Sequence, residues 1–559
     1  MSYKKLFLFL LLTCAVLPAS AQQKKEKKND KFDYLRAVDV YGSSLALLDR
    51  YFVDSVDLKR LSRISLDKML ESLDPYTEYY SAEDNDKLRL MTTGAYGGIG
   101  AVISPRADSS VIINDPMEGM PAARAGLRAG DVILEVDGQS FRKSTVDKVS
   151  AALKGAPGSK ISILIQRPGE AKSRKIEFKR EQVTINPVPY YGVLRDKTGY
   201  IALSSFPNTA ASGVKKAFLE LKEKYGITSL VLDLRDNGGG LIDEAIKIVN
   251  FFVPAGETVV TTRGGRLGRK QEAVYRTTEK PLDTTIPLVV LISETSASAS
   301  EIVSGALQDM DRAVIMGAKS YGKGLVQTTM RLPYDGTIKL TTAKYYIPSG
   351  RCIQRINYQA AREGKGATVL PDSLTGIFHT RAGREVRDAG GILPDSTLKS
   401  DSLPTMIYYL QVNNDAFDWV TDYVREHRSI ASPEHFRLSD ADYASFVARM
   451  VEKKFDYDRQ SGKELKKLEE LAKFEGYYAK SKEAFETLQK LLVPDLTHDL
   501  QYHRPAIERY LTRAILTRYY FARGARAREV HEDPQVTAAV GLLHDQPRYQ
   551  AILTPKRLK

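Results

Sequence analysis

Ser298 and Lys323 are the residues whose types and spacing most directly suggest chemistry. Ser298 lies in Ser-Ala-Ser-Ala-Ser-Glu (296–301), and Lys323 follows 25 residues later between two glycines. Serine is a weak nucleophile until a base accepts its proton, and a lysine can be that base only when burial lowers its pKa from about 10.4. All seven histidines lie beyond both segments. The pair therefore favours nucleophilic serine chemistry with a lysine general base, and Gln327 could hold the amine by a hydrogen bond.

Ser298 also has a purely structural interpretation. Ser298-x-x-Glu301 fits the capping-box pattern, so Ser298 could simply start a helix predicted over 299–309. The two interpretations are compatible, because a nucleophile at a helix N-terminus has backbone N–H groups and the positive end of the helix dipole beside it. Lys323, taken alone, would pass for an ordinary loop lysine.

Two glycine-rich segments could supply backbone N–H groups to a ligand. Gly238-Gly239-Gly240 ends a predicted buried strand, and one of its N–H groups could pair with that of Ala299 to hold an oxyanion. Gly97-Gly98-Ile99-Gly100 precedes a strand whose open edge could pair with an extended peptide, with the loop binding a terminal carboxylate. Each segment, taken alone, could equally be a tight turn.

The elements that must position these residues form a mixed pattern. Continuous apolar runs at 229–234 and 287–292 are typical of buried parallel strands, and the second leads through Ser298 and a helix to another strand at 313–317. Pro333-Tyr334-Asp335-Gly336 predicts a hairpin. We expect an α/β core over 181–395.

The flanking regions have different patterns. Residues 33–90 have helical spacing, interrupted at Asp74-Pro75, and are interpreted as a helical part of the core. Residues 91–180 hold short apolar runs separated by Gly, Pro and Asp, which predicts a small β-rich module inserted in the core. Residues 396–559 are predicted to be mostly helical.

The N-terminus predicts export. Lys4 and Lys5 precede an apolar run, and Ala19-Ser20-Ala21 is a small-residue cleavage site, so residues 1–21 are typical of a signal peptide. Residues 22–32 would then be a flexible lead-in, and the mature chain would be periplasmic or in the cell envelope. Lipid attachment at Cys14 is the alternative. Cleavage would leave Cys352 as the one cysteine, which excludes an intrachain disulfide.

Charge and motif content exclude several partners. The net charge of +13 falls to +11 (13 − 2) without Lys4 and Lys5, which in an exported protein suggests association with anionic envelope surfaces. The Arg-rich stretch 509–528 overlaps apolar residues spaced by four, typical of an amphipathic helix with a solvated basic face, so no nucleic acid is predicted. No HExxH occurs, and His531-Glu532-Asp533-Pro534 lacks a second histidine, so no metal and no cofactor are predicted.

In combination these segments resemble the C-terminal processing peptidases, also called tail-specific proteases. The resemblance covers roughly residues 35–395, and seven segments occur in the family's order. They are Leu73–Thr77, Gly97–Gly100, Ala125–Asp131, Asp233–Gly240, Ser296–Glu301, Lys323–Gln327 and Ala343–Arg351.

The resemblance implies an exported serine endopeptidase with a crotonase/ClpP-like α/β core and an inserted PDZ domain. Its substrates would be proteins with apolar C-termini, docked on the PDZ domain and cut near that end. It also implies a homo-oligomer assembled through helical regions and an activating adaptor. The implied residues are Ser298, Lys323 and Gln327 in catalysis, Gly240 and Ala299 at the oxyanion, and Gly97, Gly98, Ile99 and Gly100 at the tail.

Two other functions fit part of the pattern. A non-catalytic adaptor could capture tails and use the core as a scaffold, although it need not keep the serine, lysine, glutamine and glycines together. Acyl-thioester chemistry also uses glycine-lined oxyanion holes, but those substrates are cytoplasmic, which conflicts with the export signal.

Overall fold

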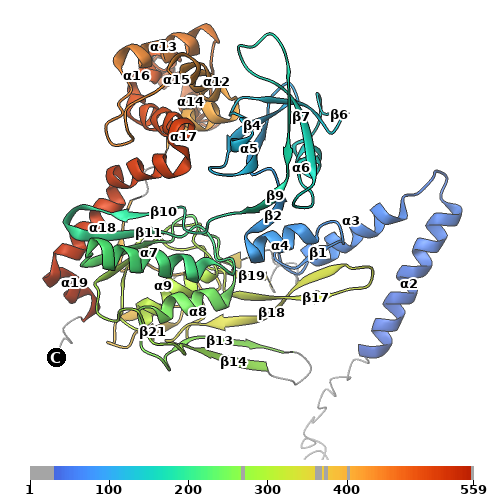
Figure 1. Cartoon of the computed structure of the whole chain (residues 1–559), viewed down its shortest axis with the longest axis vertical. Helices are drawn as coiled ribbons and strands as arrows, with labels where there is room; N and C mark the ends of the chain where they lie inside the picture. Colours follow the sequence, from blue (N-terminus) through green and yellow to red (C-terminus); the bar gives the residue numbers. More distant parts are fainter. Residues whose placement is uncertain (1–29, 266–270, 359–367, 370–374, 400–402, 555–559) are drawn as a thin grey trace, which may run out of the picture. The chain divides into compact units, whose positions relative to one another are not determined.

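The computed structural model describes residues 30–265, 271–358, 368–369, 375–399 and 403–554 (Figure 1). The predicted signal peptide, Cys14 and the lead-in as far as residue 29 lie outside the described residues. The chain divides into two compact units, residues 1–72 and 73–559, which are considered separately. None of the described helices combines the length and the apolar character that crossing a membrane requires.

The first unit is helical. Its two described helices are α2 (Asp30–Tyr51) and α3 (Leu58–Glu71). Asp57 caps α3 by accepting a hydrogen bond from the N–H of Arg60 at 3.0 Å. The helix ends before Asp74-Pro75, as predicted. The rest of the segment expected to be helical belongs to the second unit, as β1 (Glu78–Tyr80) and α4 (Asn85–Thr93).

The predicted β-rich module is confirmed and has its own core. Its sheet has the order β3-β4-β5-β7-β8, with β6 paired to β5, and β3 lies at one edge. Buried residues of these strands pack with those of two helices. The elements are β3 (Ala101–Pro105), β4 (Val111–Pro116), α5 (Pro121–Arg124), β5 (Val132–Val136), β6 (Gln139–Ser140), α6 (Val146–Leu153), β7 (Lys160–Gln166) and β8 (Arg174–Lys179).

The module is an insertion because the two chain segments that connect it to the core pair with each other. β2 (Ala95–Gly98) enters the module, β9 (Glu181–Thr184) leaves it, and they form an antiparallel ladder. The chain therefore enters and leaves the module at the same place, through this pair of strands.

The core contains a six-stranded sheet in the order β10-β11-β12-β15-β16-β23, parallel except at β10. The crossover from β15 to β16 through α9 is the predicted strand–helix–strand unit. The elements are β10 (Tyr190–Val193), β11 (Thr198–Ala202), α7 (Ala210–Tyr225), β12 (Ser229–Asp233), α8 (Ile242–Asn250), β15 (Leu288–Ile292), α9 (Ala299–Asp309), β16 (Val314–Gly317) and β23 (Ser396–Thr397).

Both faces of this sheet are covered, which explains why its strands read as continuous apolar runs. Leu230 and Leu232 of β12 face a core formed with α7, α8 and α9, whereas Val231 between them faces a second core. The second core is closed by residues near the C-terminus of the chain, in α18 (Pro534–His544) and α19 (Gln546–Leu553). Figure 1 shows these two helices beside the sheet.

A second, antiparallel sheet carries the predicted hairpin. Its order is β1-β18-β13-β14, and β17 pairs with β18 across the turn at Pro333–Gly336. Its strands are β1, β13 (Thr258–Gly264), β14 (Gln271–Arg276), β17 (Leu325–Arg331) and β18 (Thr337–Tyr346). Short pairs complete the core, namely β19 (Ile356–Asn357) with β20 (Thr368–Val369), and β21 (Ile377–His379) with β22 (Glu385–Arg387).

The C-terminal part is helical, as predicted, and most of it packs around a core of its own. Its helices before α18 are α11 (Thr405–Val412), α12 (Asp415–Glu426), α13 (Asp440–Glu452), α14 (Gln460–Phe474), α15 (Tyr478–Leu491), α16 (Leu496–Tyr502) and α17 (Arg504–Glu532). In α17 the apolar residues Ile507, Leu511 and Ile515 are buried, in agreement with an amphipathic helix.

Candidate active site

Ser298 lies in a strained turn between β15 and α9, at the carboxyl ends of the parallel strands. Its φ of 56° and ψ of −113° are unusual for a residue with a side chain, and such strain is concentrated at functional sites. Ser298 is the N-cap of α9, so the structural interpretation of this residue is also correct.

The buried carboxylate of Glu301 connects the two halves of the site. It accepts the N–H of Ser298 at 2.8 Å, of Gly322 at 2.7 Å and of Lys323 at 2.9 Å. The hydroxyl of Ser320 donates to it at 2.5 Å. Burial raises the pKa of Glu301 to about 7, although these hydrogen bonds favour the charged form. One side chain therefore fixes the backbone of the serine against the backbone of the lysine.

Lys323 is in the environment that a lysine base requires. Burial, together with the nearby charge of Lys339, lowers the pKa of Lys323 to about 8. At that pKa a substantial fraction of the amine is neutral near pH 8. The flanking glycines are sterically required, because a Cβ at Gly322 would lie 2.6 Å from the Cβ of Arg355 and one at Gly324 would lie 2.8 Å from the backbone nitrogen of Gln354.

Gln327 lies on β17 at a bulge in its pairing with β18. Its amide nitrogen donates to the hydroxyl of Thr341 at 3.1 Å. The amide oxygen is thereby left as the acceptor that an amine could use. Its contact with Lys323 remains a prediction.

The three consecutive glycines after β12 have different surroundings. A Cβ at Gly239 (φ +97°) would lie 2.8 Å from the Cβ of Ser298 and 2.9 Å from the nitrogen of Ala299, so this glycine allows the close approach. Its N–H is used by the side chain of Asn237 at 2.9 Å. Gly240 forms an isolated β-bridge with Phe206. The two hydrogen bonds of this bridge use the carbonyl of Gly239 and the N–H of Leu241, so neither uses the N–H of Gly240.

Ala299 is the first residue of α9, where N–H groups have no partner within the helix. The N–H groups of Ser300 and Glu301 donate to the carbonyls of Ala297 and Ser298. Among the hydrogen bonds of the described residues, none uses the N–H of Ala299, which leaves this donor available beside Ser298. These contacts agree with Gly240 and Ala299 as oxyanion donors, which stays a prediction.

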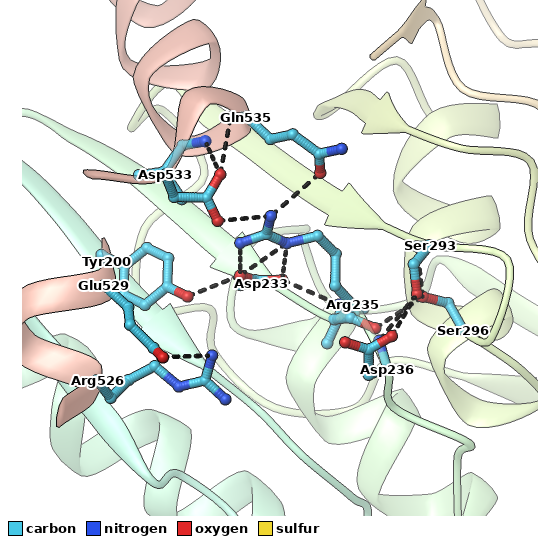
Figure 2. Close-up of polar contacts among 12 residues, drawn as sticks. Tyr200, Asp233, Arg235, Asp236, Ser293, Ser296, Arg526, Glu529, Asp533 and Gln535 are labelled. Carbon is cyan, nitrogen blue, oxygen red and sulfur yellow. Dashed lines mark hydrogen bonds and ion pairs between the residues drawn. The ribbon is translucent and has the colours of Figure 1, made fainter. Parts of the chain in front are cut away.

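The segment that carries these glycines is anchored by Arg235 (Figure 2). The guanidinium contacts Asp233 at 2.6 Å, and it also contacts two residues at the start of α18, Asp533 at 2.8 Å and Gln535 at 3.1 Å. Tyr200 donates to the same Asp233 carboxylate at 2.6 Å. The C-terminal helices thus hold the strand end from which the glycines begin.

The turn after this anchor is tied to the serine turn. Asp236 accepts from Ser293 and from Thr295, the latter at 2.8 Å, and Ser296 donates to the carbonyl of Leu234 at 2.7 Å. Ala297 donates to the carbonyl of Asn237 at 3.0 Å. The glycine segment and the nucleophile are therefore one rigid assembly.

A cavity borders the lysine loop at Leu325, and its lining includes neither Ser298 nor Lys323. This cavity, of about 720 Å³, is lined by residues of the turn before β1, of β17 and β18, and of the segment after Cys352, including Thr77, Leu325, Thr341 and Gln354. It lies along the strands that carry Gln327 and its partner Thr341.

The loop predicted to bind a tail lies where the module joins the core. Gly97 and Gly98 are in β2, and a Cβ at Gly97 would lie 2.1 Å from the carbonyl oxygen of Gly155. The carbonyls of Ile99 and Gly100 accept from Ala122 at 2.8 Å and Met117 at 3.0 Å. Gly100, with φ of +71°, turns the chain into the edge strand β3.

Three contributions were not predicted. Glu301 was predicted as the capping-box partner of Ser298, and it also binds the Lys323 loop. Tyr345, from one of the segments that carry the resemblance, donates to the carbonyl of Ser298 at 3.3 Å. Tyr76 places its ring against Lys323. The resemblance of the Leu73–Thr77 and Ala343–Arg351 segments was the available signal for the two tyrosines.

Comparisons with known proteins agree with this architecture. The model of peptidase family S41 matches residues 197–360, that of a PDZ domain matches residues 112–167, and that of a probable PDZ-protease C-terminal helical domain matches residues 406–543. The chain is 37% identical over 321 residues to a carboxy-terminal-processing protease of Bartonella bacilliformis, covering 56% of this chain and 72% of that protein.

Two further matches have lower coverage or lower similarity. A probable CtpA-like serine protease of Staphylococcus aureus is 34% identical over 328 residues, covering 58% of this chain, and the chain spans only 64% of the length of that relative. Among solved structures, a photosystem II D1 C-terminal processing protease matches with 27% identity and a TM-score of 0.34, covering 67% of this chain and 95% of that one.

Proposed function

Because the chain belongs to the carboxy-terminal-processing proteases of peptidase family S41, we propose that it is a serine endopeptidase that docks apolar C-terminal tails on its PDZ domain and cleaves near that end. The observation that carries the proposal is the coupling of Ser298 to Lys323 through the buried carboxylate of Glu301. It holds on one side chain the backbone of a strained serine and the backbone of a lysine whose pKa is lowered to about 8.

In the proposed reaction the neutral amine of Lys323 takes the proton of Ser298 as its oxygen attacks the scissile carbonyl carbon. The carbonyl oxygen becomes an oxyanion, which the N–H groups of Gly240 and Ala299 stabilise. When the C–N bond breaks, the ammonium of Lys323 gives its proton to the leaving amine. A water molecule, deprotonated by the same lysine, then hydrolyses the ester on Ser298.

Tail recognition is supported by the open edge of β3. Ile103 of this strand and Val146 of α6 pack at the margin of the module core, so apolar tail side chains would extend that core. A terminal carboxylate accepts hydrogen bonds and therefore needs N–H groups, which the backbone of this glycine-rich turn could supply.

The experiment is cleavage of one unfolded model protein by the mature chain, with an apolar C-terminal tail and with the same tail ending in Asp-Asp. We expect at least about tenfold faster cleavage of the apolar version, and complete loss in Ser298→Ala. Tail binding without turnover in the wild-type chain would instead indicate a non-catalytic adaptor. Export to the periplasm or cell envelope stays a prediction, which N-terminal sequencing of the mature chain for a start at Gln22 would test.

We also propose that the chain forms a homo-oligomer, supported by the apolar seam of α2. The seam residues are spaced alternately by four and three, which is the heptad pattern of paired helices. Its members are Tyr34, Val38, Tyr41, Leu45 and Leu48, and all but the partly buried Leu45 are exposed, Tyr34 by 67% and Val38 by 50%. The Tyr41 hydroxyl already contacts that of Ser65 in α3, so a second copy of the seam would cover mainly the exposed Tyr34, Val38 and Leu48.

Light scattering after size exclusion checks this assembly. Val38→Asp with Leu48→Asp is expected to reduce the mass of the full chain to that of one subunit. Ser43→Asp, on the opposite side of α2, is the matched control and should keep the wild-type mass. A monomeric wild type at micromolar concentration would rule out this assembly.

A further inference from the structure

The turn Leu73–Thr77, at the start of the second unit, brings an aromatic ring to the lysine of the active site. The amine nitrogen of Lys323 lies 4.2 Å from the centroid of the Tyr76 ring. At this distance over a ring face, an ammonium ion is attracted by the negative face of the π system. Tyr76 belongs to the Leu73–Thr77 segment, to which the proposed reaction gives no role.

The backbone of Tyr76 is fixed by its own turn. Asp74 accepts the N–H of Tyr76 and the N–H of Thr77 with one carboxylate oxygen, both at 2.9 Å. Its other oxygen accepts the hydroxyl of Thr77 at 3.1 Å. Asp74 and Thr77 are buried, and Pro75 between Asp74 and Tyr76 restricts the backbone further. The backbone from which the Tyr76 side chain projects is therefore fixed by contacts within the turn.

The far end of the ring is held by two other tyrosines. The Tyr76 hydroxyl donates to that of Tyr321 at 3.3 Å and accepts from that of Tyr358 at 3.4 Å. The Tyr358 ring meets the Tyr76 ring edge-on, with centroids 6.0 Å apart. Burial raises the pKa of the Tyr76 hydroxyl well above its usual range, so Lys323 meets a neutral ring and not a phenolate.

We infer that Tyr76 is a positioning residue for the general base, whose ring face holds the Lys323 amine and stabilises the ammonium ion formed when Lys323 takes the proton of Ser298. The inference rests on the proposed function. No covalent bond to Tyr76 forms, and its hydroxyl proton stays in place. The transferred proton moves from the Ser298 oxygen to the Lys323 nitrogen and later to the leaving amine.

A ring suits this position better than a carboxylate. In the described part of the chain, no carboxylate lies within ion-pair distance of the Lys323 amine, and a direct pair would keep the amine charged and unable to act as a base. A cation–π contact gives a smaller stabilisation, so the neutral amine remains populated near pH 8 while the ammonium is still favoured once it forms. The charged groups that act on Lys323 from farther away are Lys339, which opposes the ammonium, and Asp74, Glu301 and Glu78, which favour it.

The test compares Tyr76→Phe, which keeps the ring face, with Tyr76→Leu, which keeps apolar bulk and loses it. For each, kcat/KM for the tailed substrate and the rate of Ser298 labelling by a fluorophosphonate are measured from pH 5.5 to 10. The surrounding charged groups are the same in both variants, so the comparison changes only the ring and the volume of the side chain.

We expect kcat/KM of the wild type and of Tyr76→Phe to rise with pH along the same acid limb, with its midpoint near pH 8. Removing the ring takes stabilisation from the ammonium, so the limb of Tyr76→Leu should move to lower pH by roughly 0.4 to 1.5 units. Its plateau rate should fall by roughly 3- to 30-fold, because the ammonium in the transition state loses the same contact. Fluorophosphonate labelling should show the same limbs, since it needs the base and not the docked tail.

A limb that stays in place or moves to higher pH in Tyr76→Leu would overturn the inference, as would a Tyr76→Phe limb that moves with it. If circular dichroism shows that Tyr76→Leu does not fold, Tyr76→Trp decides, because its stronger ring should move the limb to higher pH and any other result overturns the inference. A wild-type chain that neither cleaves nor labels would instead refute the proposed function.

Discussion

Replacing Lys323 with Met is expected to lower kcat/KM for a tailed substrate by at least about 10³-fold while leaving the thermal midpoint nearly unchanged. Met keeps much of the length and apolar volume of the side chain but cannot accept the Ser298 proton. The backbone bond from Lys323 to Glu301 does not depend on the side chain, so the loop should keep its shape. Steady-state cleavage and fluorophosphonate labelling of Ser298 measure the loss directly.

The matched control is Lys224→Met, which removes the same charge from the exposed end of α7. It should cleave at the wild-type rate, which separates loss of the base from loss of positive charge. If Lys323→Met still labels Ser298 at the wild-type rate, another group must take the proton. The seven histidines would then have to be examined again, although the hydrogen bonds described for His427, His435 and His544 are to residues outside this site.

The secondary structure around the nucleophile could be predicted because its signals are local. The apolar runs at 229–234 and 287–292, the helix at 299–309 and the hairpin turn at 333–336 all formed as expected. A strand buried on both faces needs continuous apolar residues, and a Ser-x-x-Glu pattern marks where a helix begins. Such signals hold within about ten residues and do not depend on the rest of the fold.

Contacts between distant segments could not be predicted in the same way. The capping-box pattern already accounts for a glutamate at position 301. Nothing in the sequence therefore indicates that its carboxylate also binds the N–H groups of Gly322 and Lys323. Tyr76 reaches Lys323 across 247 residues of sequence, a separation at which spacing carries no information. The sequence of α18 is that of an apolar helix and does not indicate what it packs against, yet Val536 and Val540 pack on the core sheet and Asp533 holds Arg235.

Gly239→Ala is expected to lower kcat by roughly 10²- to 10³-fold, the usual effect of losing an oxyanion donor. The added Cβ would lie 2.7 Å from the carbonyl oxygen of Ala297, 2.8 Å from the Cβ of Ser298 and 2.9 Å from the nitrogen of Ala299. Two of these atoms are backbone and cannot swing aside, and the φ of +97° is unfavourable for alanine. The glycine segment and the serine turn must therefore separate, which moves the N–H groups of Gly240 and Ala299 apart.

Gly238→Ala supplies the comparison within the same turn. A Cβ there meets nothing within 4 Å, and the φ of Gly238 is outside the left-handed region, so we expect activity close to that of the wild type. Measuring kcat, KM and the thermal midpoint of both variants distinguishes the causes, because a displaced oxyanion hole lowers kcat far more than it raises KM. Equal activity of the two variants would mean that the close approach of Gly239 to Ser298 has no catalytic role, since the two substitutions differ in what their Cβ atoms meet and in the φ they must adopt.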